Sequence, residues 1–490
     1  MTITRRFDAA TETAPAVKPR ALALELVKAC NLRCGYCYYA QRDDAYDPKK
    51  IMSQAVARRS VDLLIEDGPA DQPLHLHFFG GEPLLNFGLL SETVRYARER
   101  GQAAAKTFTF EVTTNGTRFT PEIIRFLNEH AIHVAVSFDG PPDVQDVARP
   151  AFGGSSYAAA VGGIRALIES RRGTPLAAKI HASVVVTRAE LDVVRISRHL
   201  EELGFPKIVL TIATDLTGQS FGVRDADLPA LLDHYDRLAE DAEAKLRAGL
   251  AVPTTWYPRL LTRIRSSERK AAYCGGGRDY LGVAADGKVA LCYRFFEAKD
   301  YGMGDIFTGI DRSVTRRLEA LRPDRRTVCS ECWALAYCGG GCHHDNAFAG
   351  GGLGDPNPIT CDIFRHSMSR ALEMWGRLAR DGAGSVRPSR PAGDGMSASK
   401  KSFLSSDRPK KRGGCHVREI GDERVVYDPA THQVGVLNAT AVFIFERCDG
   451  TRTVDDLLGE MAARFEAPRE VLEKDLGAML GLLCAKNFIE

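Results

Sequence analysis

Short apolar runs alternate with longer amphipathic stretches through the first half of the chain. The runs are rich in Val, Ile, Leu and Phe, which is typical of buried strands, and the segments between them are long enough for helices. Strands joined by helical crossovers form parallel sheets, and six of them indicate an α/β fold, a partial (β/α)6 TIM barrel with its active groups at the carboxyl ends of the strands. The six predicted strands are 21–27, 74–79, 108–112, 133–138, 179–186 and 207–212.

The pattern changes several times after residue 230. A helical stretch comes first, a cysteine-rich segment that ends in an amphipathic helix around 364–381 follows, and then a stretch of Ser, Gly, Pro and Lys without periodicity. The last of these reads as a flexible linker that spans roughly 30 Å. We expect a disordered tail at 1–20, the barrel at 21–230, a helical connection at 231–273, the cysteine-rich domain at 274–381, the linker at 382–414 and a small domain at 415–490.

The last 76 residues predict a short strand meander and three helices, a small α+β domain with a winged-helix-like outline. Thr453 and Asp456 have the spacing of a capping box. Two helices there carry one apolar face each, at Val454, Leu457, Leu458, Met461 and Phe465, and at Leu472, Leu476, Met479, Leu480 and Leu483. A winged helix suggests DNA, but 8 Lys and Arg against 14 Asp and Glu give this domain the wrong sign for a phosphate partner.

Composition narrows the class of protein. The formal charge of the 490 residues is +2, which argues against nucleic acid as the main partner. We find no apolar run of 18 or more residues and no apolar stretch of a secretory signal near the N-terminus, so we expect a cytoplasmic protein without a membrane partner. In such a compartment thiols stay reduced, and the thirteen cysteines read as metal ligands before disulfides.

Cys30, Cys34 and Cys37 form a group of three thiols directly after the first predicted strand. A structural zinc site needs four ligands, so this spacing alone leaves zinc one short, unless a distant ligand completes it. An iron–sulfur cube held by three thiolates instead leaves one iron free for another ligand. Cys415, Cys448 and Cys484 stand apart and read as small packing or surface residues.

The C-x3-C-x2-C spacing resembles the signature of radical S-adenosylmethionine (SAM) enzymes, in which the free iron binds SAM. The resemblance implies that Cys30, Cys34 and Cys37 are the catalytic cluster ligands and that the aromatic Tyr36 lies against the adenine. "FFGGEPLLN" resembles the GGEP motif that contacts the SAM ammonium through its backbone. SAM-binding positions implied in this way are Tyr36, Gly80, Gly81, Glu82, Pro83, Asn115 and Ser137, with Asp139 and Arg149 as a structural pair.

The cysteine-rich segment resembles the SPASM domain of peptide-modifying radical SAM enzymes at all seven cysteines and at Gly287. The resemblance implies two auxiliary clusters and, with the first, three [4Fe–4S] clusters. Cys329, Cys332, Cys338 and Cys361 would ligate one fully; Cys274, Cys292 and Cys342 would leave a fourth position to another residue, water or substrate. A zinc ribbon is the alternative for the C-x2-C-x5-C group taken by itself.

The residue after Cys292 separates relatives within that family. Sulfatase maturases have an aspartate there, whereas this chain has Tyr293, and the surrounding sequence looks more like maturases that join a peptide cysteine sulfur to carbon, as in quinohemoprotein amine dehydrogenase maturation and ranthipeptides. A thioether crosslink is therefore the expected product. A C–C or C–O crosslink, epimerisation and formylglycine formation are alternatives. Arg294, His343, His344 and Asp345 could move protons or hold a carboxylate, or simply cap the metal sites.

"LNATA", "DGTRTVDDLL" and "EKDLGAML" in 415–490 resemble the PqqD family of peptide chaperones, the RiPP recognition element. The resemblance implies that the leader of a ribosomally synthesised precursor peptide adds as a strand to a sheet edge of this domain. The resemblance to radical SAM enzymes also implies a reducing electron donor such as flavodoxin or ferredoxin. A zinc-stabilised adaptor that binds peptides without chemistry is the alternative from another class.

Overall fold

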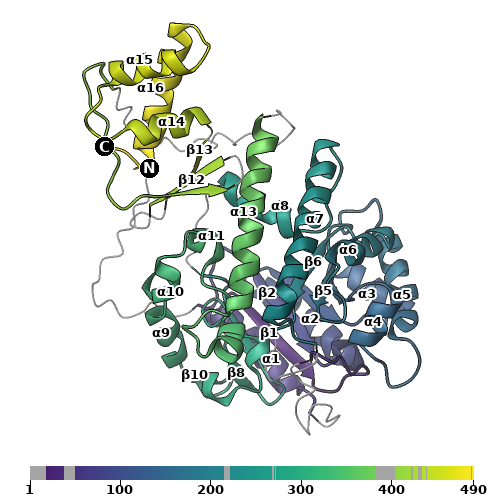
Figure 1. The fold of residues 1–490 in the computed structure, drawn as a ribbon. Helices are drawn as coiled ribbons and strands as arrows, with labels where there is room; N and C mark the ends of the chain where they lie inside the picture. Colours follow the sequence, from purple (N-terminus) through teal and green to yellow (C-terminus); the bar gives the residue numbers. More distant parts are fainter. Residues whose placement is uncertain are drawn as a thin grey trace.

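The computed structural model describes residues 18–37, 50–214, 221–266, 270, 272–380, 403–420, 423–428, 433–437, 439–486 and 488–490. Six parallel strands alternate with helices in the first half of the chain (Figure 1). These strands are β1 (Ala21–Val27), β2 (Leu74–Gly80), β3 (Phe108–Thr114), β4 (His133–Ser137), β5 (Ile180–Val186) and β6 (Ile208–Ile212). All six predicted strands are confirmed, with ends displaced by one or two residues. Of the predicted tail 1–20, residues 1–17 lie outside the described part of the chain.

Each of these strands pairs in parallel with the next one along the chain, from β1 to β6. The result is a mixed α/β fold with a large parallel sheet, compatible with a partial TIM barrel. Each helical crossover returns the chain to the amino end of the sheet, so each strand runs parallel to the strand before it. The carboxyl ends of all six strands therefore lie at one end of the sheet.

The two faces of the sheet differ in polarity because strand side chains alternate. Leu76, Phe78, Val112 and Val134 are among the fully buried residues of the main hydrophobic core. The opposite face, which we call the inner face, carries polar side chains at alternate positions. These include His75 and His77 on β2, Thr109, Glu111 and Thr113 on β3, His133 and Ser137 on β4, and His181 and Ser183 on β5.

The cysteine-rich segment extends this sheet past β1, a connection that the sequence pattern does not predict. β7 (Tyr280–Val283) pairs in parallel with β1, and β8 (Lys288–Ala290), β9 (Gly302–Asp305) and β10 (Gly309–Ile310) continue it in antiparallel order. The first half and the cysteine-rich segment therefore share one sheet and one hydrophobic core.

Helices of the first half connect the strands, and several begin at side-chain caps. Ser53, Thr120, Ser155 and Asp192 each accept a hydrogen bond from a backbone N–H in the first turn. These helices are α1 (Gln54–Asp67), α2 (Phe87–Ala103), α3 (Pro121–Glu129), α4 (Pro142–Ala148), α5 (Ser156–Arg171) and α6 (Val193–Glu202). The predicted helical connection is present as α7 (Leu228–Arg247) and α8 (Trp256–Ser266).

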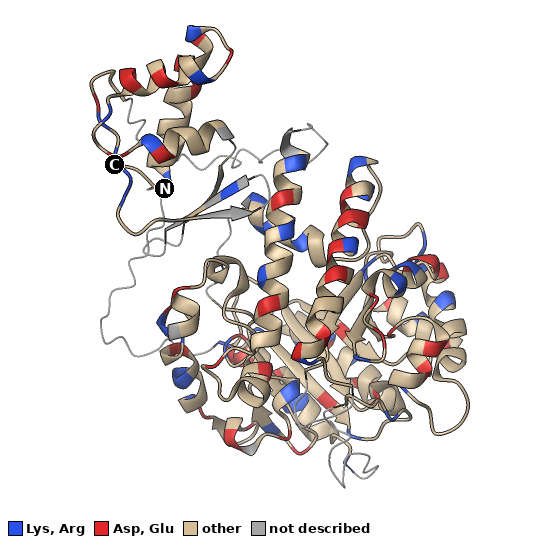
Figure 2. Ribbon diagram, in the orientation of Figure 1, with Lys and Arg blue, Asp and Glu red and all other residues tan. Residues whose placement is uncertain are grey.

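The long helix α13 (Pro358–Arg380) packs against α7 and α8 and begins six residues before the predicted amphipathic stretch. Acidic and basic residues both occur along α7 and α13 (Figure 2), and Arg377 on α13 pairs with Glu243 on α7 at 2.7 Å. Shorter helices of the same segment are α9 (Ser313–Ala320), α10 (Thr327–Ser330), α11 (Leu335–Cys338) and α12 (His343–Asp345). Along the described residues, every helix is too short or too polar to cross a membrane.

The C-terminal residues form a separate hydrophobic core, as predicted from their pattern. An antiparallel sheet of three strands packs with three helices above it (Figure 1). The elements are β11 (His416–Ile420), β12 (Glu423–Asp428), β13 (Gln433–Leu437), α14 (Ala439–Arg447), α15 (Val454–Arg464) and α16 (Arg469–Ala485). Thr453 and Asp456 make the predicted capping box at the start of α15.

The structure corrects the boundary of the predicted linker 382–414. Residues 381–402 lie outside the described part, but 403–414 belong to the C-terminal domain. Lys411 donates its backbone N–H to the carbonyl of Cys448 at 2.7 Å, and Lys410 exchanges backbone hydrogen bonds with Glu490. The partners lie about 40 to 80 residues further along the chain, so local composition could not reveal this pairing.

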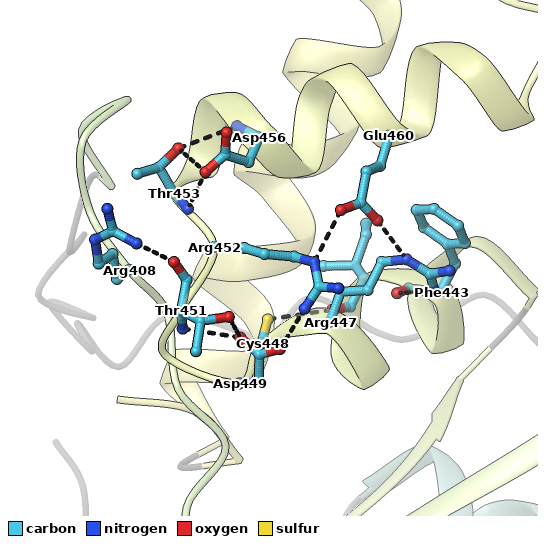
Figure 3. A network of polar contacts seen from close by, with 11 residues as sticks. Arg408, Phe443, Arg447, Cys448, Asp449, Thr451, Arg452, Thr453, Asp456 and Glu460 are labelled. Carbon is cyan, nitrogen blue, oxygen red and sulfur yellow. Dashed lines mark hydrogen bonds and ion pairs between the residues drawn. The ribbon is translucent and has the colours of Figure 1, made fainter.

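A network of polar contacts ties α14 to α15 in this domain (Figure 3). Glu460 receives hydrogen bonds from Arg447 at 2.7 Å and from Arg452 at 2.8 Å. Arg447 also lies over the ring of Phe443 at 3.6 Å. Cys448 is buried beneath and donates to the carbonyl of Ile444 at 3.2 Å, which agrees with the packing role predicted for its thiol.

Candidate active site

The loop that carries Cys30, Cys34 and Cys37 leaves the carboxyl end of β1 and is fastened to the segment after α4. Arg33 and Gly35 donate backbone hydrogen bonds to the carbonyls of Pro150 and Ala148 at 2.8 and 3.0 Å. The N–H of Cys37 reaches the carbonyl of Cys34 at 3.1 Å, which closes a tight turn between the two thiols. The sequence spacing therefore brings the three thiols near one another, which we call the cysteine cage; the thiols of Cys34 and Cys37 both contribute to the raised pKa of Cys30.

A buried ion pair supports this loop from β4. Asp139, fully buried, accepts hydrogen bonds from Arg149 Nε at 2.9 Å and from the hydroxyl of Tyr36 at 2.6 Å. Its other oxygen accepts from the backbone N–H of Val185 at 2.9 Å. Arg149 also points an N–H at Cys34 Sγ, 3.6 Å away. The structural pairing predicted for Asp139 and Arg149 is present, and it reaches a predicted metal ligand.

The GGEP segment packs against the backbone that leads into the cysteine loop. A Cβ on Gly80 would lie 2.4 Å from the carbonyl oxygen of Val27, and one on Gly81 would lie 2.3 Å from that of Ala29. Gly80 also has φ +137°, which other residues rarely adopt. Glycine is therefore required here by the chain's own backbone, whatever ligand binds nearby.

Glu82 turns its side chain into the protein. It is fully buried, and its carboxylate accepts from the N–H of Leu84 at 3.0 Å, Thr114 Oγ1 at 2.7 Å and the N–H of Asn115 at 2.8 Å. Burial raises its pKa, while these hydrogen bonds oppose the rise. The carboxylate thus links the end of β2 to the end of β3. Pro83 follows it as the first residue of a short 3-10 helix, Pro83–Asn86.

Asn115 lies beside the cysteine loop, and Ser137 lies on the inner face at the end of β4. The Asn115 amide donates to Asn31 Oδ1 at 2.9 Å and points at Cys30 Sγ, 3.8 Å away. Thr117 donates to Asn115 Oδ1 at 2.7 Å, so the orientation of the amide is fixed. Ser137 ends β4, where it pairs in register with Ser183 of β5.

The chemistry of this thiol group fits an iron–sulfur cluster. Burial raises the pKa of Cys30 and of Cys34 to about 12; neighbouring thiols add to the rise in both, and Arg149 opposes it at Cys34. Such thiols do not ionise near neutral pH unless a cation compensates the charge, and iron is a cation that thiolates bind. Three sulfurs on one turn leave a fourth coordination position to a non-cysteine ligand.

A second group of thiols forms at the other side of β1. Cys292 follows β8, and its raised pKa of about 12 is caused by burial and then by the nearby thiols of Cys342 and Cys274. Arg294 donates to Cys342 Sγ at 3.3 Å and pairs with Asp345 at 2.8 Å. The three cysteines predicted to act together therefore do lie together, with one guanidinium and one carboxylate beside them.

A third group contains the four remaining cysteines of this segment. Burial raises the pKa of Cys361 to about 12, and the thiols of Cys338, Cys329 and Cys332 contribute to that rise. The structure thus brings together four residues from α10, α11 and the start of α13.

Three consecutive glycines direct Cys338 and Cys342 to different groups. Gly339, Gly340 and Gly341 have φ of +76°, +88° and +77°, a left-handed run that other residues would make with strain. A Cβ on Gly340 would also lie 2.4 Å from Pro323 Cγ. The N–H groups of Gly340 and Gly341 donate to the Cys338 thiol. The bend was missed from the sequence, although three adjacent glycines are a signal for one.

The two histidines beside Cys342 are buried, and burial lowers the pKa of His343 and of His344 to about 4. Tyr293, the residue that stands in place of an aspartate, packs its ring against Phe79 on the inner face, 4.2 Å between centroids. An aromatic surface, rather than a base, lies between the second thiol group and the sheet.

Comparison with known proteins identifies two parts of the chain. Residues 24–178 match the family model for the radical SAM superfamily, and residues 423–489 match that for coenzyme PQQ synthesis protein D (PqqD). The serine-type anaerobic sulfatase-maturating enzyme of Bacteroides thetaiotaomicron is 34% identical over 140 residues, 28% of this chain and 33% of that enzyme. The mycofactocin maturase MftC of Mycolicibacterium smegmatis is 26% identical over 391 residues, 77% of this chain and 88% of that protein.

Among solved structures, native anSMEcpe with bound AdoMet has a TM-score of 0.62 at 18% identity, covering 74% of this chain and 100% of that chain. This likeness shows a shared fold over about three quarters of the chain. Three curated relatives, the Bacteroides enzyme among them, are matched over only 41%, 33% and 27% of their own lengths.

Proposed function

We propose that this chain, which joins a radical SAM domain to a PqqD-like domain, is an enzyme that modifies a ribosomally synthesised peptide by radical chemistry. The observation that carries the proposal is the cage of Cys30, Cys34 and Cys37 at the carboxyl end of the parallel sheet. A [4Fe–4S] cluster and SAM are what a radical SAM domain implies, and the three-thiol cage fits that cluster. When bound, they supply a 5′-deoxyadenosyl radical that takes a hydrogen atom from the peptide.

The residues around the cage have separate parts in this proposal. Cys30, Cys34 and Cys37 hold the cluster, and Arg149 balances the negative charge near Cys34 across 3.6 Å. The backbone of 80–83 and the side chains of Tyr36, Asn115 and Ser137 line the SAM position. Glu82 keeps β2 and β3 in register below it through its three hydrogen bonds.

We assign the second and third thiol groups to two auxiliary [4Fe–4S] clusters within a SPASM-type domain. Cys329, Cys332, Cys338 and Cys361 supply four thiolates, and Cys274, Cys292 and Cys342 supply three. The Arg294 guanidinium, 3.3 Å from Cys342 Sγ, stabilises negative charge at the three-thiol site. The buried histidines next to it act as packing groups that exclude water.

The product that we propose is a thioether between a peptide cysteine and carbon. Tyr293 packs on Phe79, so the position after Cys292 offers an aromatic wall and no carboxylate base. A peptide substrate could therefore lie between the inner face and the three-thiol site without meeting the group that sulfatase maturases use. Other radical modifications of peptides remain alternatives, and the mass of the product separates them.

The C-terminal domain, winged-helix-like in this assignment, binds the precursor's leader as an added strand at an edge of its sheet. β11 and β13 are the outer strands of that sheet, since each pairs with β12. Fusion to the catalytic part raises the effective concentration of the core peptide there. A reduced flavodoxin or ferredoxin in the cytoplasm would supply electrons.

The first test measures iron and acid-labile sulfide per chain after anaerobic reconstitution. Three cubes require about twelve of each. Cys361→Ser should lower iron by about four per chain, whereas Cys448→Ser, a buried cysteine outside the three groups, should leave it unchanged. Zinc without sulfide would instead favour the peptide-binding adaptor and refute the radical mechanism.

The second test is turnover. The reconstituted chain, given dithionite and SAM, should release 5′-deoxyadenosine, and a cysteine-bearing precursor should lose two hydrogens in mass. A crosslinked product whose cysteine still reacts with iodoacetamide would contradict the thioether and favour a C–C or C–O crosslink.

A further inference from the structure

A cluster of imidazoles and one carboxylate lies on the inner face, away from the thiol groups. Glu111 on β3, His133 on β4 and His181 on β5 bring one ligand atom each within 4.8 Å of the others. Glu111 pairs in register with His133, and His181 lies diagonally beside it, opposite Ala135. Parallel pairing thus places three metal-binding side chains from three adjacent strands at one spot.

A fourth candidate ligand faces the same spot from β2. His75 Nε2 lies 3.6 Å from Glu111 Oε2. His75 Nδ1 lies 2.9 Å from Thr109 Oγ1, and that hydroxyl donates its own hydrogen to the carbonyl of Leu74 at 3.2 Å. This arrangement orients the His75 ring so that Nε2 faces the Glu111 carboxylate.

A hydroxyl that holds the far nitrogen of an imidazole sets the orientation of the ring, and metal-bound histidines usually have such a support. His75 therefore faces Glu111 from β2 as a side chain that could reach a metal bound by the other three residues.

The remaining pair needs little movement to ligate. His133 Nε2 and His181 Nδ1 are 2.8 Å apart and share one hydrogen. Two nitrogens on a tetrahedral zinc, at 2.0–2.1 Å from the metal, would be about 3.3 Å apart.

We propose that Glu111, His133 and His181 bind one divalent cation of the zinc class at the amino-terminal half of the inner face. Two imidazoles and one carboxylate supply three of the four positions of a tetrahedral zinc site, and water or His75 would supply the fourth. The ion would cross-link β3, β4 and β5. Asn115 lies four residues beyond Glu111, just past the end of β3, which is about 13 Å at 3.3 Å per residue, so the site is separate from the cysteine cage and does not depend on the proposed function.

The test uses the full chain, anaerobically reconstituted with iron and sulfide and then given equimolar Zn²⁺. Elemental analysis should find one zinc per chain beside the full iron content. X-ray absorption at the zinc edge should show nitrogen and oxygen neighbours at about 2.0–2.2 Å. A zinc–sulfur distance of about 2.3 Å would place the zinc on vacated cysteines and overturn the proposal, as would a zinc content near zero.

Substitutions that nearly keep the shape of a side chain but remove its metal-binding atom test where the zinc binds. Glu111→Gln and His181→Asn should each weaken zinc binding at least about tenfold while iron content stays constant. His366→Asn is the matched control, since His366 Nε2 also contacts a carboxylate, Asp236 Oδ1 at 2.7 Å, on the outer helices. Equal zinc retention in all three variants would refute the assignment. If a variant fails to hold iron, the X-ray absorption spectrum of the unsubstituted chain still shows whether its zinc is bound by nitrogen and oxygen or by sulfur.

Discussion

Removing the guanidinium of Arg149 should destabilise the main core far more than removing one from the surface. Asp139 and Arg149 have exposed side-chain fractions of 1% and 8% and lie 2.9 Å apart. Arg149→Ala leaves the carboxylate buried with only Tyr36 and the Val185 N–H as donors. Breaking a buried pair from one side costs about 3–5 kcal/mol in the free energy of unfolding.

Arg195→Ala is the matched control. Arg195 makes contacts of 2.7 Å to Asp143 and 2.6 Å to Glu190, as short as those of Arg149, but its side chain is 44% exposed. Exposed pairs contribute about 0–1 kcal/mol. The comparison therefore isolates burial from hydrogen-bond length.

Urea unfolding of the apo-protein, followed by tryptophan fluorescence, measures the difference. The three tryptophans of the chain, Trp256, Trp333 and Trp375, all pack against the main core, so the signal reports that core without the C-terminal domain. If Arg149→Ala and Arg195→Ala lower the free energy of unfolding by amounts that agree within about 0.5 kcal/mol, burial is not what makes the Asp139–Arg149 pair important, and the reasoning is refuted.

Three further predictions concern other parts of the chain. Deleting 403–490 should slow turnover of the full precursor but keep SAM cleavage without peptide within about twofold, because this domain has its own core; equal loss of both would contradict a recognition role. Burial lowers the pKa of His77 from 6.5 to about 4, so the unfolded chain binds more protons between these values and stability should fall as pH drops from 6.5. The loss by pH 5 is on the order of 2 kcal/mol, and a pH series of urea midpoints should show a shallower slope for His77→Gln. Gly340→Ala should lower iron content, since its Cβ meets Pro323 at φ +88°, whereas Gly162→Ala, in open space on α5, should keep iron unchanged.

The sequence predicts those parts of the structure that depend on nearby residues. The six strands follow from local apolar runs, and the capping box at Thr453 follows from a spacing of three. Asp139 and Arg149 were predicted as a structural pair within the segment 137–150, where they lie ten residues apart. Each of these relations spans few residues, so pattern and propensity suffice.

Relations between distant residues could not be predicted in the same way. The pairing of β7 with β1 joins residues about 260 apart, and no local signal marks it. Likewise, the histidines of the inner face belong to separate strands, and only their register brings them together. The predicted thiol groups are an exception, because the resemblance to a known family supplied the long-range grouping.

The pairing of 403–414 with the end of the chain has a mechanical consequence for the C-terminal domain. A force that reaches this domain through its N-terminal connection enters at a segment bridged to Asp449 and to Ile489 in antiparallel fashion. The hydrogen bonds of Lys410, Lys411 and Arg412 to Glu490, Cys448 and Phe488 join this segment to the residues that follow α14 and α16. Tension on the connection is therefore passed to two helices of the domain and not to the first strand β11 alone.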